Sequence, residues 1–376
     1  MSRVLGTVSR GIRLPIIKSG EQKLESIIID SLKQASIESN TNFKDKDIIC
    51  ITESLVARAA NNYVTIDDIA NEIKQIFGEN ATIGVLYPIY SRNRFSMILK
   101  GIAKAAKKVV IQLHEGKDEV GNDLVNPFTN IDIIEFYKSV VLSENAECEI
   151  ITSDSIFKIL EYTKDIIIST IHTRFNDYNA IIQTQFFDYK GIVMPQPNKV
   201  ITLDKICCEM NNKHGYNTLY GVLGSNKATD NSLKLFPNKD TCKTLCDNIQ
   251  KYFKDTYDVN IEVMVYGDGC FKDPVGGIWE FADPVVAPYA TDGLKSSPNE
   301  LKIKYLTDNE NMSTEDIKNA IKDKDNDLKG NMLSEGTTPR RYSDLVGSLA
   351  DLTSGSGDKG TPVIWISGYF DNYNDD

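Results

Sequence analysis

The densest group of side chains suited to catalysis follows a run of β-branched residues. The segment Ile261–Tyr266 predicts a buried strand, and Asp268 lies between two glycines directly after it. An aspartate in that position can hold a divalent ion while the glycines let the backbone approach a phosphate. A lysine and further acids follow closely: Lys272, Asp273, Glu280 and Asp283. Hard oxygen donors favour Mg²⁺ or Mn²⁺. The alternative is a glycine-rich turn with solvated acids.

A second group lies at the end of another predicted strand, Asp47–Thr52. Glu53 and Ser54 come directly after it, and Arg58 follows four residues beyond Ser54. If a helical turn begins there, Ser54 and Arg58 face the same way and the turn's amide groups can hold phosphate. The rigid donor fork of arginine suits a phosphate clamp. A salt bridge from Arg58 to Glu53 explains the same residues equally well.

Three further segments leave two interpretations open. Pro15 fixes the backbone inside the short apolar run of Gly11–Glu21, which is either a strand leading into a helix or a platform for a base or ribose. The loop Gly224–Lys227 lacks the GK[ST] spacing of a phosphate-binding Walker loop, so an ordinary turn is the first expectation. The glycine turn Gly355–Gly357 fits a linker nearly as well as a nucleotide contact.

Two arginines and a polar loop indicate a substrate site. Arg92 and Arg94 lie at the start of an expected helix, where positive charge opposes the helix dipole. An anion between them, such as a carboxylate or phosphate, makes this arrangement favourable; surface salt bridges are the alternative. The loop after the strand Lys107–Leu113 carries polar side chains in a usual position for site residues of α/β proteins. These side chains are Asp118, Glu119 and Asn122.

Strands and helices alternate along the chain, which predicts the α/β (or α+β) class. Helical patterns cover Glu21–Ser36, Ile66–Phe77, Arg94–Ala106 and Thr241–Phe253. A further helix after Arg341 is expected to have an apolar face of Leu345, Leu349 and Leu352. We expect a main α/β domain of residues 1–215 plus 331–376. Residues 216–330 would form a second domain with the Ser-Asn and Asp-Gly loops.

Composition narrows the functional class. The formal net charge of −11 argues against a general nucleic-acid binder, because phosphate backbones require a cationic face. No run of about 18 apolar residues predicts a membrane span, and the N-terminal residues lack the apolar region of a signal peptide. The 7 cysteines include no CxxC pair, so reduced thiols are expected rather than zinc ligands. We therefore expect a soluble cytoplasmic protein.

The segments with candidate catalytic and binding residues occur in the same order as in the coenzyme F-420 gamma-glutamyl ligases, which this chain resembles. Leu14-Pro15-Ile16-Ile17 resembles the family's opening LPLI-type motif, and Ser225-Asn226 resembles its SN motif. Glu53, Ser54 and Arg58 resemble its strand that ends in a small polar pair with a basic residue four later. The family's D-T-x-G-R-x(4)-G-x(2)-D signature resembles Asp268, Gly269, Lys272, Gly277 and Glu280. Its C-terminal DE-x(7)-L-x-G-x-G segment resembles Asp344 through Gly357.

The resemblance implies an enzyme that joins L-glutamate to a small carboxylate acceptor through an acyl phosphate. It implies GTP (or ATP) as co-substrate and Mg²⁺ or Mn²⁺ as the metal ion, and it leaves open K⁺ as an additional ion. The fold would be the family's unusual one with mixed sheets, unlike that of Mur ligases, in an intertwined homodimer.

Site residues carry over from the same motifs. Nucleotide contacts fall on Leu14, Pro15, Ile16, Ile17, Ser54, Arg58, Asn226 and Ser356. Metal contacts fall on Asp268, Gly269 and Glu280, and catalytic roles on Asp268, Arg58 and Lys272. The expected substrate residues come from the chain's own pattern and not from a family motif: Arg92, Arg94, Asp118, Glu119 and Asn122.

The sequence also departs from the family pattern. Leu223 stands where the family has an acid two residues before its SN pair, and Gly269 and Lys272 replace a threonine and an arginine. Two alternatives therefore stay open. One is an amide ligase acting on a different acid, such as a folate-like acceptor. The other is a nucleotide-binding protein without catalysis.

Overall fold

The computed structural model describes most of the chain. The described residues are 6–90, 94–119, 121–127, 130–171, 173–183, 188–189, 192–193, 196–209, 216–272, 279–296, 307–308, 312–322, 341–354 and 360–371. For residues 94, 188–189, 192–193, 268–272, 279–286 and 320–322 it describes the backbone alone.

The first of two large sheets has five strands in the order β1-β15-β2-β13-β14. Their bounds are β1 Val8–Ile12, β15 Val363–Ser367, β2 Ile48–Thr52, β13 Glu262–Lys272 and β14 Trp279–Ala290. β2 and β13 run parallel, and the other neighbours are antiparallel. The sheet is therefore mixed, as predicted.

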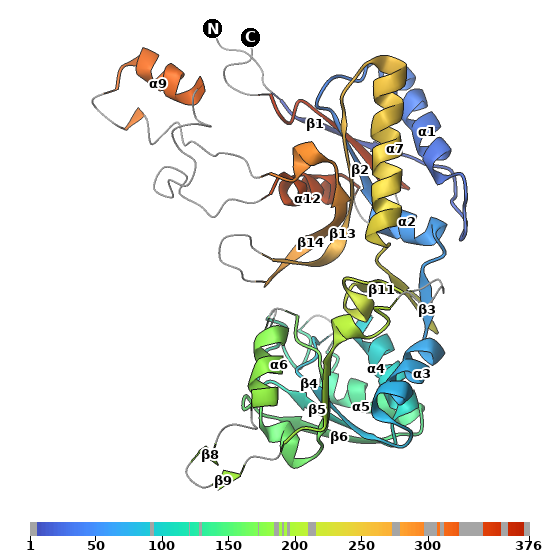
Figure 1. Cartoon of the computed structure of the whole chain (residues 1–376), viewed down its shortest axis with the longest axis vertical. Coiled ribbons are helices and arrows are strands. Elements are labelled where there is room, and N and C mark those ends of the chain that lie inside the picture. Colours follow the sequence, from blue (N-terminus) through green and yellow to red (C-terminus); the bar gives the residue numbers. More distant parts are fainter. Residues whose placement is uncertain are drawn as a thin grey trace.

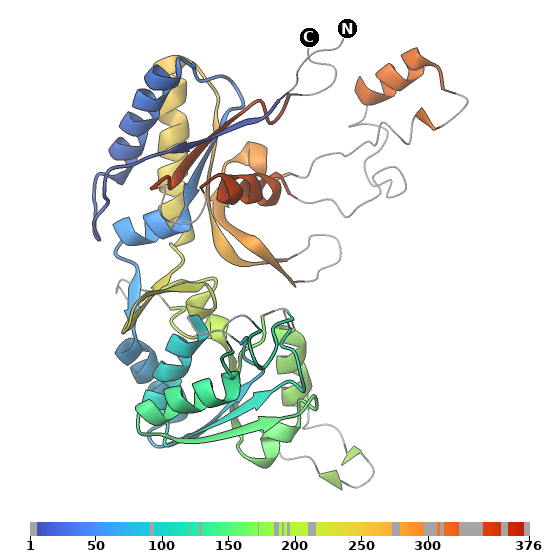
Figure 2. The same ribbon diagram turned by 180° about the vertical axis from the view of Figure 1, so that it is seen from behind.

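Helices cover both faces of this sheet (Figures 1 and 2). Because successive side chains of a strand point to opposite faces, Ile49 and Ile51 of β2 pack in one core while Ile48 and Cys50 pack in another. The first core includes α1 (Leu24–Ser39) and α7 (Lys239–Tyr257), and the second includes α12 (Tyr342–Ser354). Strands buried on both faces explain the continuous β-branched runs in the sequence.

The predicted apolar face of α12 is confirmed only in part. Leu349 packs against the core on this side of the sheet, beside Val346 and Ala350, whereas Leu352 is 78% exposed. The sheet side chains that face this helix are large and include Met264 and Tyr266. Small helix side chains therefore fill the remaining space, since protein interiors are close-packed.

The second large sheet is entirely parallel, in the order β10-β7-β4-β5-β6. Its strands are β4 Thr82–Leu86, β5 Lys108–Leu113, β6 Glu147–Thr152, β7 Asp165–Ile168 and β10 Lys199–Thr202. The chain starts in the middle with β4, adds β5 and β6 on one side, and then adds β7 and β10 on the other. This is a doubly wound order.

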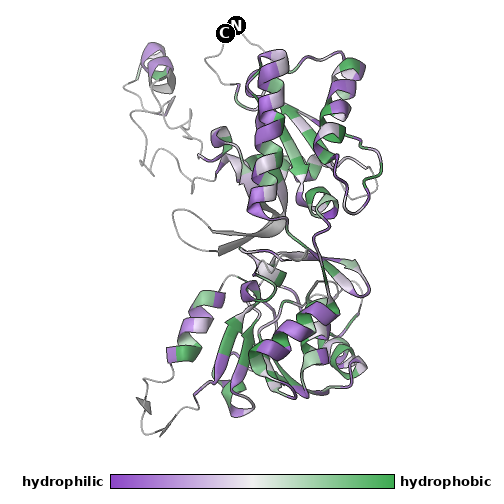
Figure 3. Ribbon diagram, turned by 45° about the vertical axis from the view of Figure 1, so that its right-hand side comes forward, coloured by the Kyte–Doolittle hydropathy of each residue, from purple (hydrophilic) through white to green (hydrophobic). Residues whose placement is uncertain are grey.

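Helices cover both faces of the parallel sheet as well. One face packs against α3 (Ile66–Phe77), α4 (Arg94–Ala105) and α5 (Ile133–Ser143). The other packs against α6 (Arg174–Ile182) and a 3₁₀ turn at Lys158–Glu161. In Figure 3 the strands of both large sheets are mostly hydrophobic, and the helices alternate between the two colours. A parallel sheet needs this double cover because both its faces are apolar.

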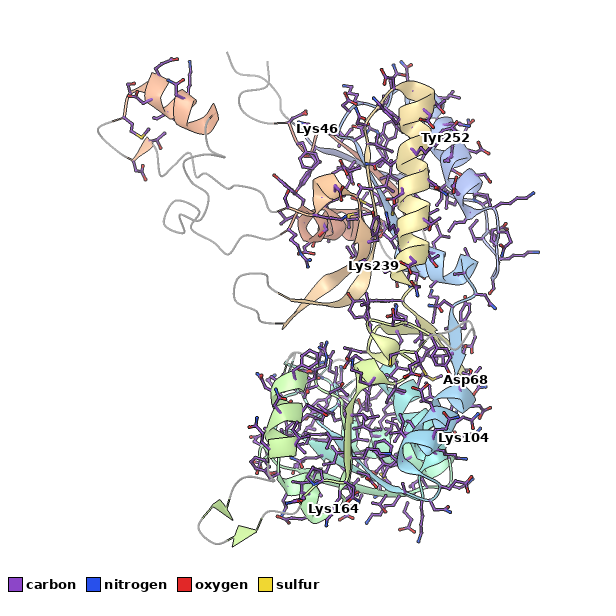
Figure 4. All side chains as sticks on the ribbon, viewed as in Figure 1. Lys46, Asp68, Lys104, Lys164, Lys239 and Tyr252 are labelled. Carbon is purple, nitrogen blue, oxygen red and sulfur yellow. The ribbon has the colours of Figure 1, made fainter. Side chains whose placement is uncertain are left out.

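A small antiparallel sheet lies between the two large sheets (Figure 1). It contains β11 (Ser225–Thr229), β12 (Ser232–Leu235) and β3 (Tyr63–Thr65). Figure 4 places Lys239, at the start of α7, on one side of it and Asp68, at the start of α3, on the other. The small sheet thus forms the junction between the large ones.

The remaining elements are short. They are α2 Glu53–Ala59, β8 Asp188–Tyr189, β9 Ile192–Val193, α9 Thr314–Lys322 and the 3₁₀ turns Leu203–Lys205, Gly221–Leu223 and Asp292–Leu294. Across the predicted domain boundaries, β2 pairs with β13 over Ile48–Thr52 and Glu262–Tyr266. The division into domains stays a prediction. Within the described part of the chain, no helix is long and apolar enough to cross a bilayer.

Candidate active site

A cavity of about 690 Å³ lies where the first large sheet meets the small sheet. Its walls come from segments that are far apart in the sequence: the residues after β1, the β2–α2 junction, β11 and β12, β13, and the residues between α12 and β15. Pockets for small molecules commonly have volumes of roughly 300–1,000 Å³. The size therefore suits a nucleotide-sized ligand.

One wall of the cavity is apolar and is formed by Leu14, Pro15, Ile16 and Ile17. The Leu14 amide donates a hydrogen bond to the Gly360 carbonyl at 3.3 Å, which ties this segment to the residues before β15. Ile17 is buried, but Ile16 is 92% exposed. An isoleucine exposed beside a cavity can contact the apolar face of a flat ring.

Glu53 forms the centre of a polar wall of the same cavity. It is the first residue of α2 and only 4% exposed. One carboxylate oxygen, Oε2, accepts hydrogen bonds from Thr52 Oγ1 at 3.0 Å and from the Ser54 amide. The other, Oε1, accepts from Asn226 Nδ2 at 3.0 Å. These bonds hold the end of β2, the start of α2 and β11 together.

The backbone of β13 packs closely on Glu53. A Cβ atom built on Gly267 would lie 2.7 Å from Glu53 Oε2, closer than real Cβ contacts allow. A side chain at this position would therefore displace the Glu53 carboxylate. Asp268 follows Gly267 directly, so the backbone of the predicted metal ligand begins at the cavity wall.

Lys234 adds a cation to the same wall. It lies on β12 directly opposite Asn226 of β11, and its half-buried ammonium donates a hydrogen bond to Ser54 Oγ. Burial lowers the pKa of Lys234; the charge of Glu53 opposes this shift and the nearby positive charge of Arg58 adds to it. Tyr266 of β13 also lines the cavity, and burial raises the pKa of its hydroxyl.

A protein-family model for F420-0:gamma-glutamyl ligase matches residues 11–368. The chain belongs to the F420-0:gamma-glutamyl ligase family. This confirms the resemblance deduced from the motifs and supports a general role as a ligase. No curated protein matched the chain.

The comparison with solved structures gives only remote likenesses. The chain is 14% identical to eIF2B beta from Chaetomium thermophilum over 37% of this chain and 40% of that one, with a TM-score of 0.21. It thus spans about 40% of that protein's length. It is 14% identical to the biosynthetic arginine decarboxylase of Campylobacter jejuni over 87% and 67% of the two chains, with a TM-score of 0.15. Neither likeness carries an argument about the ligase.

The structure brings one predicted group together. The residues for which nucleotide contact was predicted, and which the structure describes, all line the 690 Å³ cavity: Leu14, Pro15, Ile16, Ile17, Ser54, Arg58 and Asn226. The helical turn expected from Ser54 to Arg58 is α2. Ser356 lies outside the described residues.

The predicted Asp-Gly loop is not a loop. β13 continues through Asp268 and Gly269 to Lys272, and it pairs with β14, where Phe271 lies opposite Glu280. Glycines do not end a strand when a neighbouring strand supplies backbone partners, and register shifts on either side of Gly267 absorb the irregularity. The side chains of Asp268, Lys272 and Glu280 lie outside the described part of the structure.

The predicted substrate residues lie elsewhere, at the carboxyl edge of the parallel sheet. Asp118 accepts hydrogen bonds from the Tyr90 amide at 2.9 Å and from the Asn122 amide at 2.8 Å, and Glu119 accepts one from the Ile171 amide. These acids connect the loops after β4, β5 and β7. Arg92 lies outside the described residues, and Arg94 begins α4 with its side chain undescribed. Substrate binding by this group stays a prediction.

Sequence reasoning missed Lys234 and the central position of Glu53. Two signals were available. Lys234 stands between the buried residues Leu233 and Leu235, so strand alternation places it on the opposite face from the core. Glu53 directly follows a mostly apolar strand, and an acid buried at such a position needs hydrogen-bond partners.

The metal predicted for this family is only partly accounted for. Glu53 and Asp351 supply hard oxygen donors to the cavity, which fits the chemistry of Mg²⁺ or Mn²⁺. Among the described residues, however, no three acidic, cysteine or histidine side chains form a metal-binding group. The oxygen donors of Glu53 and Asp351 therefore suit the ion, but they are too few to form a complete metal site.

Proposed function

We propose that this chain is a nucleoside-triphosphate-dependent gamma-glutamyl ligase that forms an amide between L-glutamate and a cofactor-type carboxylate. The observation that supports it is the convergence of the predicted nucleotide residues on one cavity. Leu14–Ile17, the pair Ser54 and Arg58, and Asn226 come from three separate parts of the chain, yet they line the same space. Such convergence is expected if the motifs share one ligand.

The apolar and polar walls of the cavity would bind different parts of the nucleotide. Exposed Ile16 and its neighbours would hold the base, and the polar wall, with Ser54 and Arg58, would face the phosphates. GTP is the first expectation and ATP the second. Mg²⁺ or Mn²⁺ would supply charge neutralisation on the phosphate chain when bound.

The reaction needs an activated acid because a carboxylate does not condense with an amine in water. The terminal phosphoryl group would pass to the acceptor carboxylate and leave the nucleoside diphosphate. The amine of glutamate would then attack the acyl carbon, displacing inorganic phosphate and losing a proton. The cavity's fixed charges would stabilise the transferred group, and its walls would position the reactants.

Leu223 favours a second candidate, a nucleotide-binding protein without catalysis. It stands where the family has an acid, and it is buried in the hydrophobic core of the parallel sheet. A leucine in that environment cannot hold a metal ion.

Phosphate release separates the two candidates. The purified protein would be incubated with GTP or ATP, Mg²⁺ or Mn²⁺, L-glutamate and a panel of acids that includes folate-like acceptors. A ligase releases phosphate only when metal, glutamate and the right acid are all present. A binding protein retains nucleotide, measured in parallel by calorimetry, and releases no phosphate with any acid.

A further inference from the structure

We propose that Lys234 binds the phosphate chain of the nucleotide and that Glu53 positions it through Ser54 and Asn226. This inference rests on the proposed function, because it assigns a residue to the phosphate end of the same cavity. It adds a cation that none of the sequence motifs contains.

The β11–β12 hairpin directs Lys234 toward the cavity. Asn226 and Lys234 are paired across the two strands, so their side chains lie on the same face. Leu233 and Leu235 occupy the other face and pack in the hydrophobic core below. Because side chains alternate between the two faces of β12, Lys234 lies at the cavity wall. A shift of one residue in the register of the strand would turn its side chain into the core instead.

Lys234 retains capacity to bind an anion. An ammonium group has three donors, and within the described part of the chain its one hydrogen-bond partner is Ser54 Oγ. The Glu53 carboxylate is engaged by Thr52, the Ser54 amide and Asn226. The remaining donors of Lys234 are thus available to a ligand in the cavity.

A second cation on this wall makes an anion favourable. Arg58 also lines the cavity, and its charge repels that of Lys234. Of the other charged side chains at the cavity, Lys227 pairs with Asp230 at 2.9 Å, and Asp351 comes from α12. A phosphate chain between Lys234 and Arg58 would offset their repulsion. An ammonium suits phosphate as a compact point charge, and arginine as a two-pronged donor.

Calorimetric binding of a matched ligand series tests this assignment. The ligands are GTP, ATP, guanosine and inorganic tripolyphosphate. Lys234→Met keeps the length of the side chain but removes its charge, and Lys234→Arg restores a cation. The control is Lys107→Met, which makes the same charge change on an exposed lysine directly before β5.

We expect Lys234→Met to weaken GTP and tripolyphosphate binding by about 10- to 100-fold, the range for losing a charge-assisted hydrogen bond. Guanosine binding should be unchanged, Lys234→Arg should recover part of the affinity, and Lys107→Met should match the wild type. Unchanged GTP affinity in Lys234→Met overturns the inference and leaves the proposed function standing. Equal losses of affinity for guanosine and GTP in Lys234→Met overturn the inference too, because they indicate that the substitution distorts the cavity as a whole. A wild-type protein that binds no nucleotide refutes the proposed function itself.

Discussion

Two opposite charges lie at the cavity wall, Glu53 at the start of α2 and Lys234 on β12. Glu53 is nearly fully buried and receives hydrogen bonds from Thr52, Ser54 and Asn226, so the cost of removing its charge from water is offset locally. The cost of removing the charge of Lys234 from water is less fully offset, and burial lowers its pKa. The pair therefore combines a structural acid with a cation that stays incompletely satisfied until a ligand arrives.

Glu53→Gln tests the structural half of this description. The new side chain keeps one acceptor oxygen, so its NH2 group would face either Asn226 Nδ2 or the Ser54 amide and leave buried donors there without an acceptor. We expect the free energy of unfolding to fall by about 1–3 kcal/mol. Urea denaturation measures this change, with the exposed Glu79→Gln as control. A loss no larger than that of the control would show that the carboxylate is not needed for the fold.

The pH dependence of stability tests the environment of Lys234. Its pKa in the folded protein lies below the usual value of 10.5, so between these two values the unfolded chain binds more protons than the folded one. Stability therefore rises with pH across that range. We expect the wild type to gain unfolding free energy relative to Lys234→Met as the pH increases toward 10.5. A constant difference between the two proteins across the alkaline range would contradict the lowered pKa.

At the scale of elements, the site depends on how closely β13 approaches α2. Gly267→Ala would place a methyl group against Glu53, whose neighbours hold it on the other side. We expect Glu53 to be displaced, the protein to lose about 1–3 kcal/mol of stability, and nucleotide affinity to fall. Gly6→Ala is the matched control, because a Cβ there meets no atom within 4 Å. The close approach is disproved if both variants unfold at the same urea concentration and bind nucleotide alike.

The elements themselves were largely predictable from local patterns. The β-branched runs became β2, β4, β5 and β15, and α3 has the predicted bounds Ile66–Phe77, which begin after a capping box formed by Thr65 and Asp68. Their partners were not predictable. β2 pairs with β13, some two hundred residues further along the chain, and no periodicity encodes that choice.

The grouping of some cavity residues was predictable where a motif contained them. Ser54, Arg58 and Asn226 were selected through their spacing and order, and they line one cavity; their contact with nucleotide stays a prediction. Lys234 was missed because its position depends on which face of a hairpin turns toward a distant strand. The prediction for Leu352 of α12 was wrong for a related reason: the size of the facing sheet residues, rather than the hydrophobicity of Leu352, decides which helix side packs.

At the scale of the whole molecule, the cavity lies where the first large sheet meets the small sheet, and the doubly wound parallel sheet lies on the other side of the small sheet (Figure 1). The family resemblance also predicts an intertwined homodimer. We expect light scattering after size-exclusion chromatography to give twice the 42.0 kDa of one chain. A mass of one chain over a range of protein concentrations would contradict the predicted dimer without affecting the cavity.

The central claim is that the cavity supports nucleotide-driven addition of glutamate to an acid. The most direct measurement is mass spectrometry of candidate acids after incubation with the protein, GTP or ATP, Mg²⁺ or Mn²⁺ and L-glutamate. The account predicts that one acid gains one or more glutamyl units, and that the gain requires both nucleotide and metal. No gain on any acid, although calorimetry shows that nucleotide binds, would contradict the ligase assignment and favour a binding protein.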